Sequence, residues 1–572
     1  MRFRAPSLVV AILAAMLGSA FLPSGAAIAQ PTAPLNRGEL SGHAIATDSA
    51  LAPPNSVDTA AIDAAFERGK QLETEGRWGE AILHYDDALR QFPKNDELHQ
   101  HRVIARLHYD LGRRYSDPTF LDAAATLSRE TVLQLGREVL TKVETHHVDS
   151  PSWRGVLNHG TLNFEVALID PVFLDKHLPQ TETAQINAFR RELRERLDSI
   201  AINNREDVLE AINVAAWMGS QRLGLSEPTV VLEYVCGTVN MLDDYSSFLT
   251  KGELGEVHAQ IEGNFVGLGI ELRPTDNGLE IVRAISGSPA EAAGIRAGDV
   301  IVEVDGVTAL GGNGDTAADL LQGPAGTHTD VIVKSADGQS RSLRVRRDHV
   351  EVPSVEDIKI IDKERGIAYF RLTSFQKTTS REMDDALWKL HHEGMMSLII
   401  DLRGNPGGLL TASVEAADKF LTSGVIVSTR GRHPGEDYTH RARPASTWHV
   451  PLTVLIDQDS ASASEIFAGA IRDHKRGSIV GTRSYGKGSV QGIFSLNTAG
   501  TGIRLTTAKF YSPVGHPFSK VGVSPDVEVR TAAKPIEGRL PITSALNDPY
   551  VAAGLQVARE RMAQRSAQRG SR

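Results

Sequence analysis

Residues 457–465 read Asp-Gln-Asp-Ser-Ala-Ser-Ala-Ser-Glu and begin where the apolar run at 452–457 ends. A short apolar run of this kind predicts a buried strand, and the pattern at 464–472 predicts a helix. This serine turn (residues 457–465) would therefore lie at a helix N-terminus, where free backbone N–H groups can hold a developing oxyanion. A serine in it is well placed to act as a nucleophile.

A nucleophilic serine needs a base, and Lys487 lies further along the chain between Gly486 and Gly488. Glycine neighbours allow the tight turn that would bring the amine to the serine. A lysine accepts a proton only when it is neutral, so burial must lower its pKa well below the usual value of about 10.4. The neutral amide of Gln491 can orient that amine without favouring its charged form.

The residues around the serine turn alternate between strand and helix patterns. Residues 367–372 and 398–402 predict strands, and residues 382–391 and 413–421 predict helices. This alternation is typical of an α/β core with a parallel sheet, in which sites lie in the strand-to-helix turns. We expect this core to span residues 351–535, with a second such turn at 401–408, the glycine turn, which reads Asp-Leu-Arg-Gly-Asn-Pro-Gly-Gly.

A glycine-punctuated β pattern precedes the core. The segments 266–272, 287–295 and 298–306 together resemble a PDZ domain, which we place at 262–350. That resemblance implies that a substrate peptide binds by strand addition, with its terminal carboxylate held on backbone N–H groups. The alternative is a small β-domain without peptide-binding capacity. The loop that would hold the carboxylate is Gly267, Leu268, Gly269 and Ile270.

Residues 61–250 have helical periodicity, and residues 225–250 lead into the β-type and α/β segments that follow. Gly76, Trp78, Ala81, Tyr85, Ala88 and Pro93 occur in the order of one tetratricopeptide repeat, so residues 62–95 predict a tetratricopeptide-like unit. A lone repeat cannot bury its own face, and we expect it to pack on the helices that follow. The helical region would either bind a partner, such as an adaptor, or serve as a scaffold.

The N-terminus has the layout of a secretory signal peptide at residues 1–29: two arginines, an apolar run and a small-x-small end. An uncleaved anchor is the alternative. Residues 30–60 predict a flexible linker and residues 536–572 a C-terminal tail. We therefore expect a periplasmic or secreted protein with no membrane span after signal cleavage.

Composition excludes several classes of function. The chain has 572 residues and a net charge of −10, so it lacks the basic surface that nucleic-acid binding requires. One cysteine, Cys236, excludes a cysteine-based zinc site, and its apolar helix predicts a buried side chain. The pairs at 146–147 and 391–392 read as surface histidines, since neighbouring helical residues point apart. We expect no metal and no cofactor.

The chain resembles the C-terminal processing peptidases, or tail-specific proteases, over residues 225–530. This family consists of PDZ-containing serine peptidases with a Ser/Lys dyad. The resemblance implies Ser462 as nucleophile, Lys487 as general base, Gln491 as the residue orienting the lysine, and the backbone N–H groups of Ala463 and of Gly408 or Gly407 as oxyanion donors. The matching motifs occur in the family's order at 242–249, 262–350, 401–408, 460–465, 486–491, 505–515 and 525–526.

The sequence departs from the family's pattern in places. Asp244 stands where a proline is usual and Tyr245 where a histidine is common, and the helical leader is not part of the usual pattern. The resemblance implies a secreted serine endopeptidase that binds apolar C-terminal protein tails on its PDZ domain and cleaves through an acyl-enzyme. The alternative is a non-enzymatic peptide-binding scaffold that uses the PDZ and tetratricopeptide-like surfaces.

Other readings of the serine turn stay open. Ser462 and Glu465 have capping-box spacing, in which the serine would only bond a helix N–H group. Ser460 and Ser464 are rival nucleophiles. Asp473 and His474 suggest a triad, but both would lie at the far end of the helix from Ser462.

Overall fold

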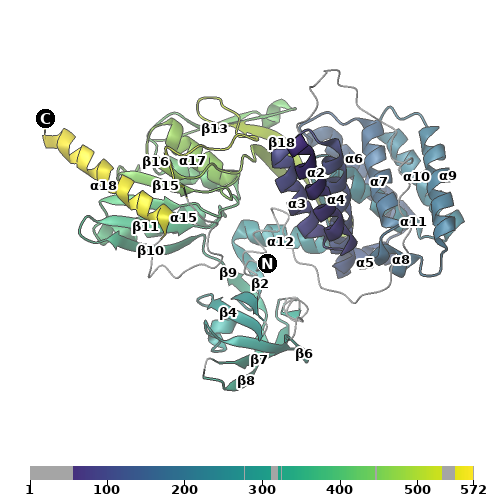
Figure 1. Cartoon of the computed structure of the whole chain (residues 1–572), viewed down its shortest axis with the longest axis horizontal. Helices are drawn as coiled ribbons and strands as arrows, with labels where there is room; N and C mark the ends of the chain where they lie inside the picture. The colour runs from purple at the N-terminus through teal and green to yellow at the C-terminus, as the bar shows by residue number, and fades with distance from the viewer. Residues whose placement is uncertain are drawn as a thin grey trace.

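The protein is described here from a computed structural model, which covers residues 56–570 except 276, 311–319, 322, 324, 336, 445–446 and 531–547. The expected signal peptide and most of the expected linker lie outside these residues. Figure 1 shows a helical region on one side, an α/β core on the other and a small β domain below them. Within the described ranges, no helix combines the length and apolar composition that a membrane crossing needs.

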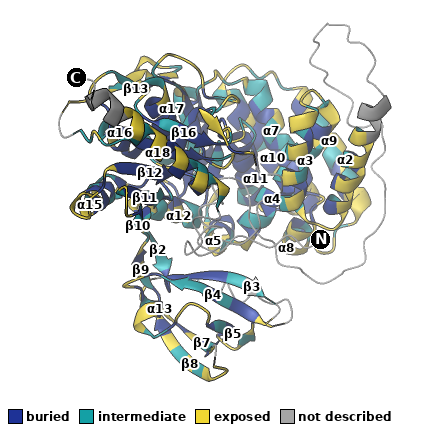
Figure 2. Cartoon of the chain, turned by 60° about the vertical axis from the view of Figure 1, so that its left-hand side comes forward, coloured by how far each residue is buried: buried dark blue, intermediate teal, exposed yellow. Residues whose placement is uncertain are grey.

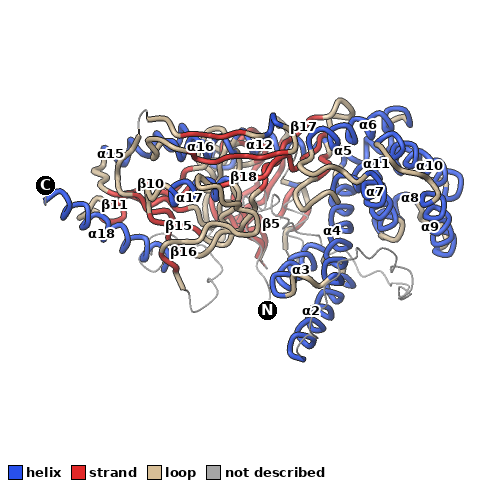
Figure 3. The backbone as a smooth tube through the Cα atoms, turned by 90° about the horizontal axis from the view of Figure 1, so that it is seen from above, coloured by secondary structure: helices blue, strands red, loops and turns tan. Residues whose placement is uncertain are grey.

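The helical region has two hydrophobic cores. Phe66, Tyr85, Leu98 and their neighbours form a small core among the first three helices, which project to one side in Figure 3. The later helices share a larger core that includes Cys236, which is buried as predicted. The helices are α2 (Ser56–Thr74), α3 (Trp78–Gln91), α4 (Asp96–Ser116), α5 (Pro118–Thr126), α6 (Arg129–His146), α7 (Trp153–Ala167), α8 (Pro171–His177), α9 (Thr183–Asp198), α10 (Arg205–Leu223) and α11 (Glu227–Asn240).

The PDZ domain is joined to the rest by the ribbon of β2 and β9, visible as a neck in Figure 2. Its main sheet has the order β3-β4-β5-β7-β8, with β6 pairing β5, so β3 is an edge strand. The elements are β2 (Asn264–Gly267), β3 (Ile270–Thr275), β4 (Gly278–Ala284), α13 (Pro289–Ala292), β5 (Val300–Val304), β6 (Val307–Thr308), β7 (His328–Lys334), β8 (Ser340–Arg346) and β9 (Asp348–Glu351).

The core is built on a mixed six-stranded sheet in the order β10-β11-β12-β15-β16-β19. Edge strand β10 is antiparallel to β11, and the other four pairings are parallel. The strands are β10 (Val355–Asp362), β11 (Ile367–Leu372), β12 (Ser397–Asp401), β15 (Leu452–Ile456), β16 (Ser478–Gly481) and β19 (Val527–Glu528), and the helices on one face are α15 (Thr379–His392), α16 (Leu410–Asp418) and α17 (Ala463–Asp473).

Strand alternation distributes the apolar side chains between the two faces of this sheet. Ala368 and Phe370 pack with the helices just named, whereas Ile367 and Tyr369 share a second cluster with Val551 and Leu555 of α18 (Pro549–Gly570). The expected C-terminal tail thus contains a helix that covers the second face.

A second sheet lies between the core and the helical region. Its path is β1-β18-β13-β14, with β17 also pairing β18. Ile503 and Leu505 of β18 belong to the large core of the helical region, so the two parts pack together. The elements are β1 (Ser247–Leu249), β13 (Val425–Gly431), η1 (Pro434–Glu436), β14 (Tyr438–Arg441), β17 (Ser489–Ser495) and β18 (Gly502–Tyr511), and α12 (Lys251–Glu262) links β1 to the PDZ domain.

Candidate active site

The serine turn connects β15 to α17, as the sequence predicts. Ser462 precedes the helix with φ +56° and ψ −112°, a conformation that L-residues rarely adopt and that costs about 1–3 kcal/mol. Gly407 packs against it, because a Cβ at Gly407 would lie 2.7 Å from the Ser462 Cβ. Such strain next to a close backbone approach is typical of a residue held for function.

The two rival serines are engaged in structural bonds. The Ser460 hydroxyl donates to the Leu402 carbonyl oxygen at 2.8 Å, and the Ser464 hydroxyl donates to the Asn405 carbonyl oxygen at 2.9 Å. Both side chains are buried. These bonds attach the serine turn to the glycine turn. Of the three serines, Ser462 is the one that lines a cavity between the serine turn, the glycine turn and α12.

Ser462 and Glu465 do have capping-box positions at the start of α17. The Glu465 carboxylate accepts the Ser462 backbone N–H at 2.9 Å. The Ser462 hydroxyl also lies toward the Glu465 N–H in the reciprocal capping-box position, but it makes no cap hydrogen bond of full geometry among the described residues. The Glu465 N–H donates instead to the Ser462 carbonyl oxygen at 2.9 Å, so the hydroxyl is held only loosely by the cap.

The glycine turn brings a second backbone donor to the serine. The Gly407 N–H already donates to the Asn405 side chain at 2.8 Å. Within the described residues, the N–H groups of Gly408 and Ala463 have no such partner. Of the two glycines that the sequence leaves open, the geometry therefore favours Gly408 as an oxyanion donor beside Ala463.

Lys487 lies in the lysine loop (residues 484–488), on the same cavity as Ser462. Gly488 has φ +57°, and a Cβ there would lie 2.1 Å from the Ser519 backbone nitrogen, so only glycine fits. Burial, and after it the nearby Arg504 guanidinium, together lower the pKa of Lys487 to about 8, although Glu465 and Asp243 oppose the shift. A substantial fraction of this amine is therefore neutral near pH 8.

Glu465 joins the two halves of the site, a role that its capping spacing does not reveal. Besides the Ser462 N–H, its carboxylate accepts the Gly486 N–H at 2.6 Å, the Lys487 N–H at 2.9 Å and the Ser484 hydroxyl at 2.6 Å. Burial raises the pKa of this fully buried carboxyl, and the four bonds oppose that shift. One side chain thus aligns the serine turn with the lysine loop.

Gln491 and Tyr245 complete the surroundings of Lys487. Gln491 lines the same cavity, but its Nε2 donates to the Ser489 hydroxyl at 3.0 Å, so its role in orienting the lysine stays a prediction. The Tyr245 ring centroid lies 4.9 Å from the Lys487 Nζ. Tyr245, noted from sequence only as a departure from the family's pattern, therefore covers the candidate base.

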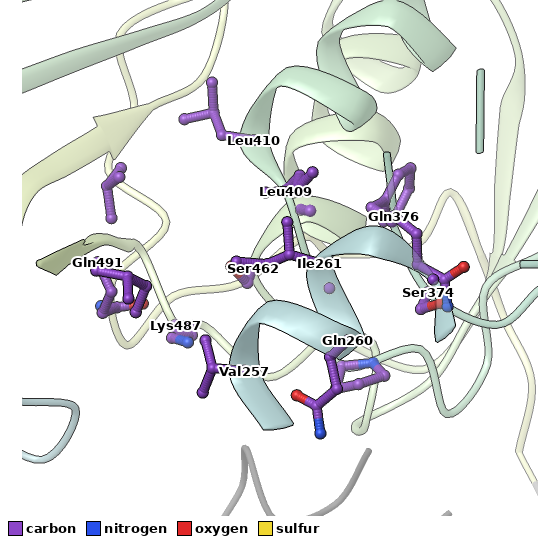
Figure 4. Close-up of a pocket in the computed structure, with 18 of the residues that line it drawn as sticks. Val257, Gln260, Ile261, Ser374, Gln376, Leu409, Leu410, Ser462, Lys487 and Gln491 are labelled. Carbon is purple, nitrogen blue, oxygen red and sulfur yellow. The ribbon is translucent and has the colours of Figure 1, made fainter. Parts of the chain in front are cut away.

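The cavity that holds Ser462, Lys487 and Gln491 has a volume of about 210 Å³ and a largely apolar lining. Figure 4 shows Val257, Gln260 and Ile261 of α12 on one side of Ser462, and Leu409 and Leu410 on another. Its wall suits an apolar substrate side chain beside the nucleophile.

Two sequence interpretations involving histidine are settled by the structure. The His474 Nε2 bonds the Val425 carbonyl oxygen at 2.7 Å, beyond the far end of α17, so it does not form a triad with Ser462. The surface assignment of His147 is wrong. This residue is 4% exposed, and its Nε2 lies 2.9 Å from the Asp243 Oδ2. A contact between segments so distant in sequence gives no local signal.

The candidate peptide-binding loop lies at the start of the PDZ edge strand. Gly267 ends β2, Leu268 and Gly269 form the turn, and Ile270 begins β3. An edge strand leaves one row of backbone groups without a partner strand. β3 therefore has the placement that strand addition requires.

Comparison with known proteins places the chain in a family. Residues 366–529 match the model of peptidase family S41, and residues 280–335 match a PDZ domain model. A carboxy-terminal-processing protease of Bartonella bacilliformis is 34% identical over 342 residues, which cover 58% of this chain and 78% of the relative. The chain belongs to peptidase family S41.

Other members show the same relationship. A probable CtpA-like serine protease of Staphylococcus haemolyticus is 33% identical over 50% of this chain and 57% of the relative. A solved photosystem II D1 C-terminal processing protease is 26% identical and covers 70% of this chain and 93% of its own, with a TM-score of 0.37. By its family and its curated relatives, the chain is a serine-type C-terminal processing protease that carries a PDZ domain and an N-terminal helical region.

The low pKa of Lys487 predicts how activity depends on pH. The base must be neutral, so kcat/KM should rise with pH through about 8 and be lost as the pH falls below that value. Arg504→Gln removes a charge that opposes protonation of Lys487, so the apparent pKa should rise. Activity at pH 7 should fall, because a smaller fraction of the Lys487 amine is then neutral; every half unit by which the pKa rises lowers that fraction about threefold.

This prediction is checked by pH–rate profiles of the Arg504→Gln enzyme beside wild type. Lys509→Gln is the matched control, because Lys509 is an exposed cation on the same strand, β18. Superimposable profiles for Arg504→Gln and wild type would show that Arg504 does not act on the base.

Proposed function

We propose that this S41 protein is an extracytoplasmic serine endopeptidase in which Ser462 and Lys487 form the catalytic dyad. The observation that carries the proposal is the joint attachment of both residues to Glu465: the carboxylate bonds the N–H of Ser462 and the N–H of Lys487, each at 2.9 Å. A strained serine and a lysine of lowered pKa therefore face one cavity in fixed register.

The reaction follows from this arrangement. The neutral Lys487 amine takes the Ser462 proton as Oγ attacks the scissile carbonyl carbon. The N–H groups of Gly408 and Ala463 stabilise the tetrahedral oxyanion. Its collapse breaks the C–N bond, and the Lys487 ammonium gives its proton to the leaving amine. Water, deprotonated by Lys487, then attacks the acyl-enzyme and restores the Ser462 hydroxyl.

We further propose that substrates are proteins with an apolar C-terminal tail, bound along β3 with the carboxylate on residues 267–270. The edge position of β3 and the turn at Leu268 and Gly269 support this mode of binding. The signal-like residues 1–29 support export.

The test combines cleavage with covalent labelling. An unfolded protein ending in an apolar tail should be cut by the chain, and the same protein with two C-terminal aspartates should be cut at least about tenfold less efficiently, a loss of roughly 1.4 kcal/mol of recognition. A fluorophosphonate probe located by mass spectrometry should modify Ser462. A label on Ser460 or Ser464 would contradict the nucleophile, and tail binding without cleavage or labelling would favour the scaffold.

A further inference from the structure

Arg102 of α4 lies between the N-terminal hairpin, formed by α2 and α3 (residues 56–91), and a segment next to the candidate base, the tyrosine turn (residues 243–246). Its Nε donates to the Asp86 Oδ1 on α3 at 2.5 Å, and its Nη1 donates to the Asp244 Oδ1 at 2.9 Å. The Arg102 side chain is 19% exposed, whereas Asp86 and Asp244 are 37% and 58% exposed, so only the Arg102 end of these charge-assisted bonds is shielded from water. Arg102 thus links α3, α4 and the tyrosine turn.

Helix α4 holds the same turn at a second point. The Arg106 Nη1 donates to the Asp243 carbonyl oxygen at 3.3 Å and lies 3.6 Å from the Asp244 Oδ1. Arg102 and Arg106 are spaced so that both side chains leave the same face of the helix. The turn is therefore attached to α4 through both its backbone and the Asp244 side chain.

Hydrogen bonds inside the turn connect Asp243 to Tyr245, so Tyr245 is held in place when the turn is. The Asp243 Oδ1 accepts the N–H groups of Tyr245 at 2.7 Å and Ser246 at 2.8 Å. The Tyr245 ring in turn covers the Lys487 amine, with 4.9 Å between the ring centroid and Nζ. A shift of the turn would uncover the amine to water.

We propose that Arg102 is a positioning residue for Lys487, acting through Asp244 and the Tyr245 ring. This inference rests on the proposed function, because it concerns the surroundings of the proposed base. The N-terminal helical region then supports catalysis from within the chain, in addition to any partner that it binds. Asp244 and Tyr245 are the two positions at which the 242–249 motif departs from the family's pattern. The inference gives them a shared role, which is to hold the tyrosine ring over the Lys487 amine.

Charged side chains of α3 also affect the pKa of a residue in the lysine loop. Burial raises the pKa of Tyr485, the residue before Gly486; Asp86 and Asp244 raise it further, and Arg90 of α3 opposes them. The Tyr245 and Tyr485 phenols interact with each other. The titratable and charged groups about Lys487 are Arg504 from β18, Glu465 from α17, Asp243 and Tyr245. His147, at the end of α6, pairs with Asp243, and Tyr485 interacts with Tyr245. The groups about Arg102 are Asp86, Asp244 and Arg106.

The first test compares Arg102→Ala with Arg77→Ala. Arg77 forms ion pairs with Glu75 and Glu80 on the same hairpin and serves as the matched control. Arg102→Ala should lower kcat about tenfold with little change in KM, since displacing a catalytic group by 1 Å can cost up to about 10²-fold. Its pH–rate profile should shift to higher pH, and Arg77→Ala should match wild type in both.

Two further variants separate positioning from folding. Asp244→Asn keeps the size of the side chain, removes its charge and should reproduce the Arg102→Ala profile. The double variant should be no worse than either single one, because both break the same link. Arg102→Lys should recover part of the loss. Circular dichroism and thermal unfolding of each variant show whether it is folded, and Asp244→Asn decides the question if Arg102→Ala does not fold.

A readout independent of cleavage distinguishes this inference from the proposed function. Competitive acetylation across a pH series, read by mass spectrometry at Lys487, measures the pKa of that amine in inactive protein as well. If wild type does not cleave but Arg102→Ala still raises this pKa, the proposed function fails and the positioning role stands. If Arg102→Ala and Asp244→Asn leave kcat, the pH profile and Lys487 acetylation at wild-type values, the positioning role is overturned.

Discussion

Ser462→Ala and Lys487→Ala are each expected to reduce kcat for peptide cleavage by roughly 10⁴-fold or more, the scale seen when a member of a serine–base unit is removed. Alanine at 462 removes the atom that forms the acyl-enzyme. Alanine at 487 leaves the serine without a base, because the Ser484 hydroxyl, which bonds Glu465 beside it, is not basic enough to take a proton at neutral pH. The double variant should be no worse than either single one, because the two residues act as a unit.

Matched variants make this result specific to the dyad. Ser460→Ala and Ser464→Ala remove hydroxyls that bond the glycine turn and, for Ser460, also Asp457 of the serine turn itself, so each should keep measurable cleavage and lose about 1 kcal/mol of stability per hydrogen bond removed. Lys509→Ala tests the loss of an exposed lysine elsewhere. The measurement is kcat on an unfolded substrate, with circular dichroism of each variant. Continued cleavage by Ser462→Ala would show that another residue is the nucleophile.

The parts of the site that sequence predicts are those fixed by local pattern. The ends of β12 and β15 follow from short apolar runs, and Ser462 lies where the strand-to-helix alternation places a reactive turn. Glycines around Lys487 show that this loop is tight. These features depend on residues close in sequence, so one chain is enough to read them.

The parts that sequence misses are contacts between distant segments. Glu465 reads locally as a capping residue, and its bonds to Gly486 and Lys487 exist only once α17 and the lysine loop pack together. His147 looks like a surface histidine until β18 and the tyrosine turn bury it. Neither helical periodicity nor residue type carries that information.

The C-terminal helix is a similar case. The sequence assigns residues 536–572 only to a C-terminal tail, yet Val551 and Leu555 in this stretch are buried against the core sheet. Before the helix, Asp548 bonds Arg403 at 2.9 Å, and Arg403 in turn pairs with the fully buried Asp401 at 2.6 Å. The glycine turn, which bears Gly408, is therefore anchored by a segment that only the fold brings near.

Glu465→Gln is expected to lower kcat by about 10²-fold or more and to cost about 1–3 kcal/mol of stability for each buried N–H group left unpaired. The carboxylate accepts four hydrogen bonds, two on each oxygen: the N–H groups of Ser462 and Lys487 on Oε2, and the Gly486 N–H with the Ser484 hydroxyl on Oε1. Glutamine has a single side-chain oxygen, so its amide NH₂ group must face two of these four donors, and it cannot accept hydrogen bonds from them.

The two orientations of the glutamine amide differ in cost. With its oxygen toward Ser462 and Lys487, the Ser484 hydroxyl can rotate to accept, and only the Gly486 N–H loses its bond. With its oxygen toward Ser484 and Gly486, both catalytic residues lose theirs. The first orientation is therefore favoured, and it displaces the glycine beside the base.

Glu465→Asp separates the effect of charge from that of reach. Aspartate keeps the charge, but its shorter side chain cannot span the serine turn and the lysine loop together, so it should lose activity while remaining more stable than Glu465→Ala, which leaves all four donors unpaired. The measurements are kcat and thermal unfolding of the three variants. If Glu465→Gln matched wild type in both, the two loops would have to hold their register without this carboxylate. The joint attachment of Ser462 and Lys487 to Glu465 would then no longer support the proposed dyad.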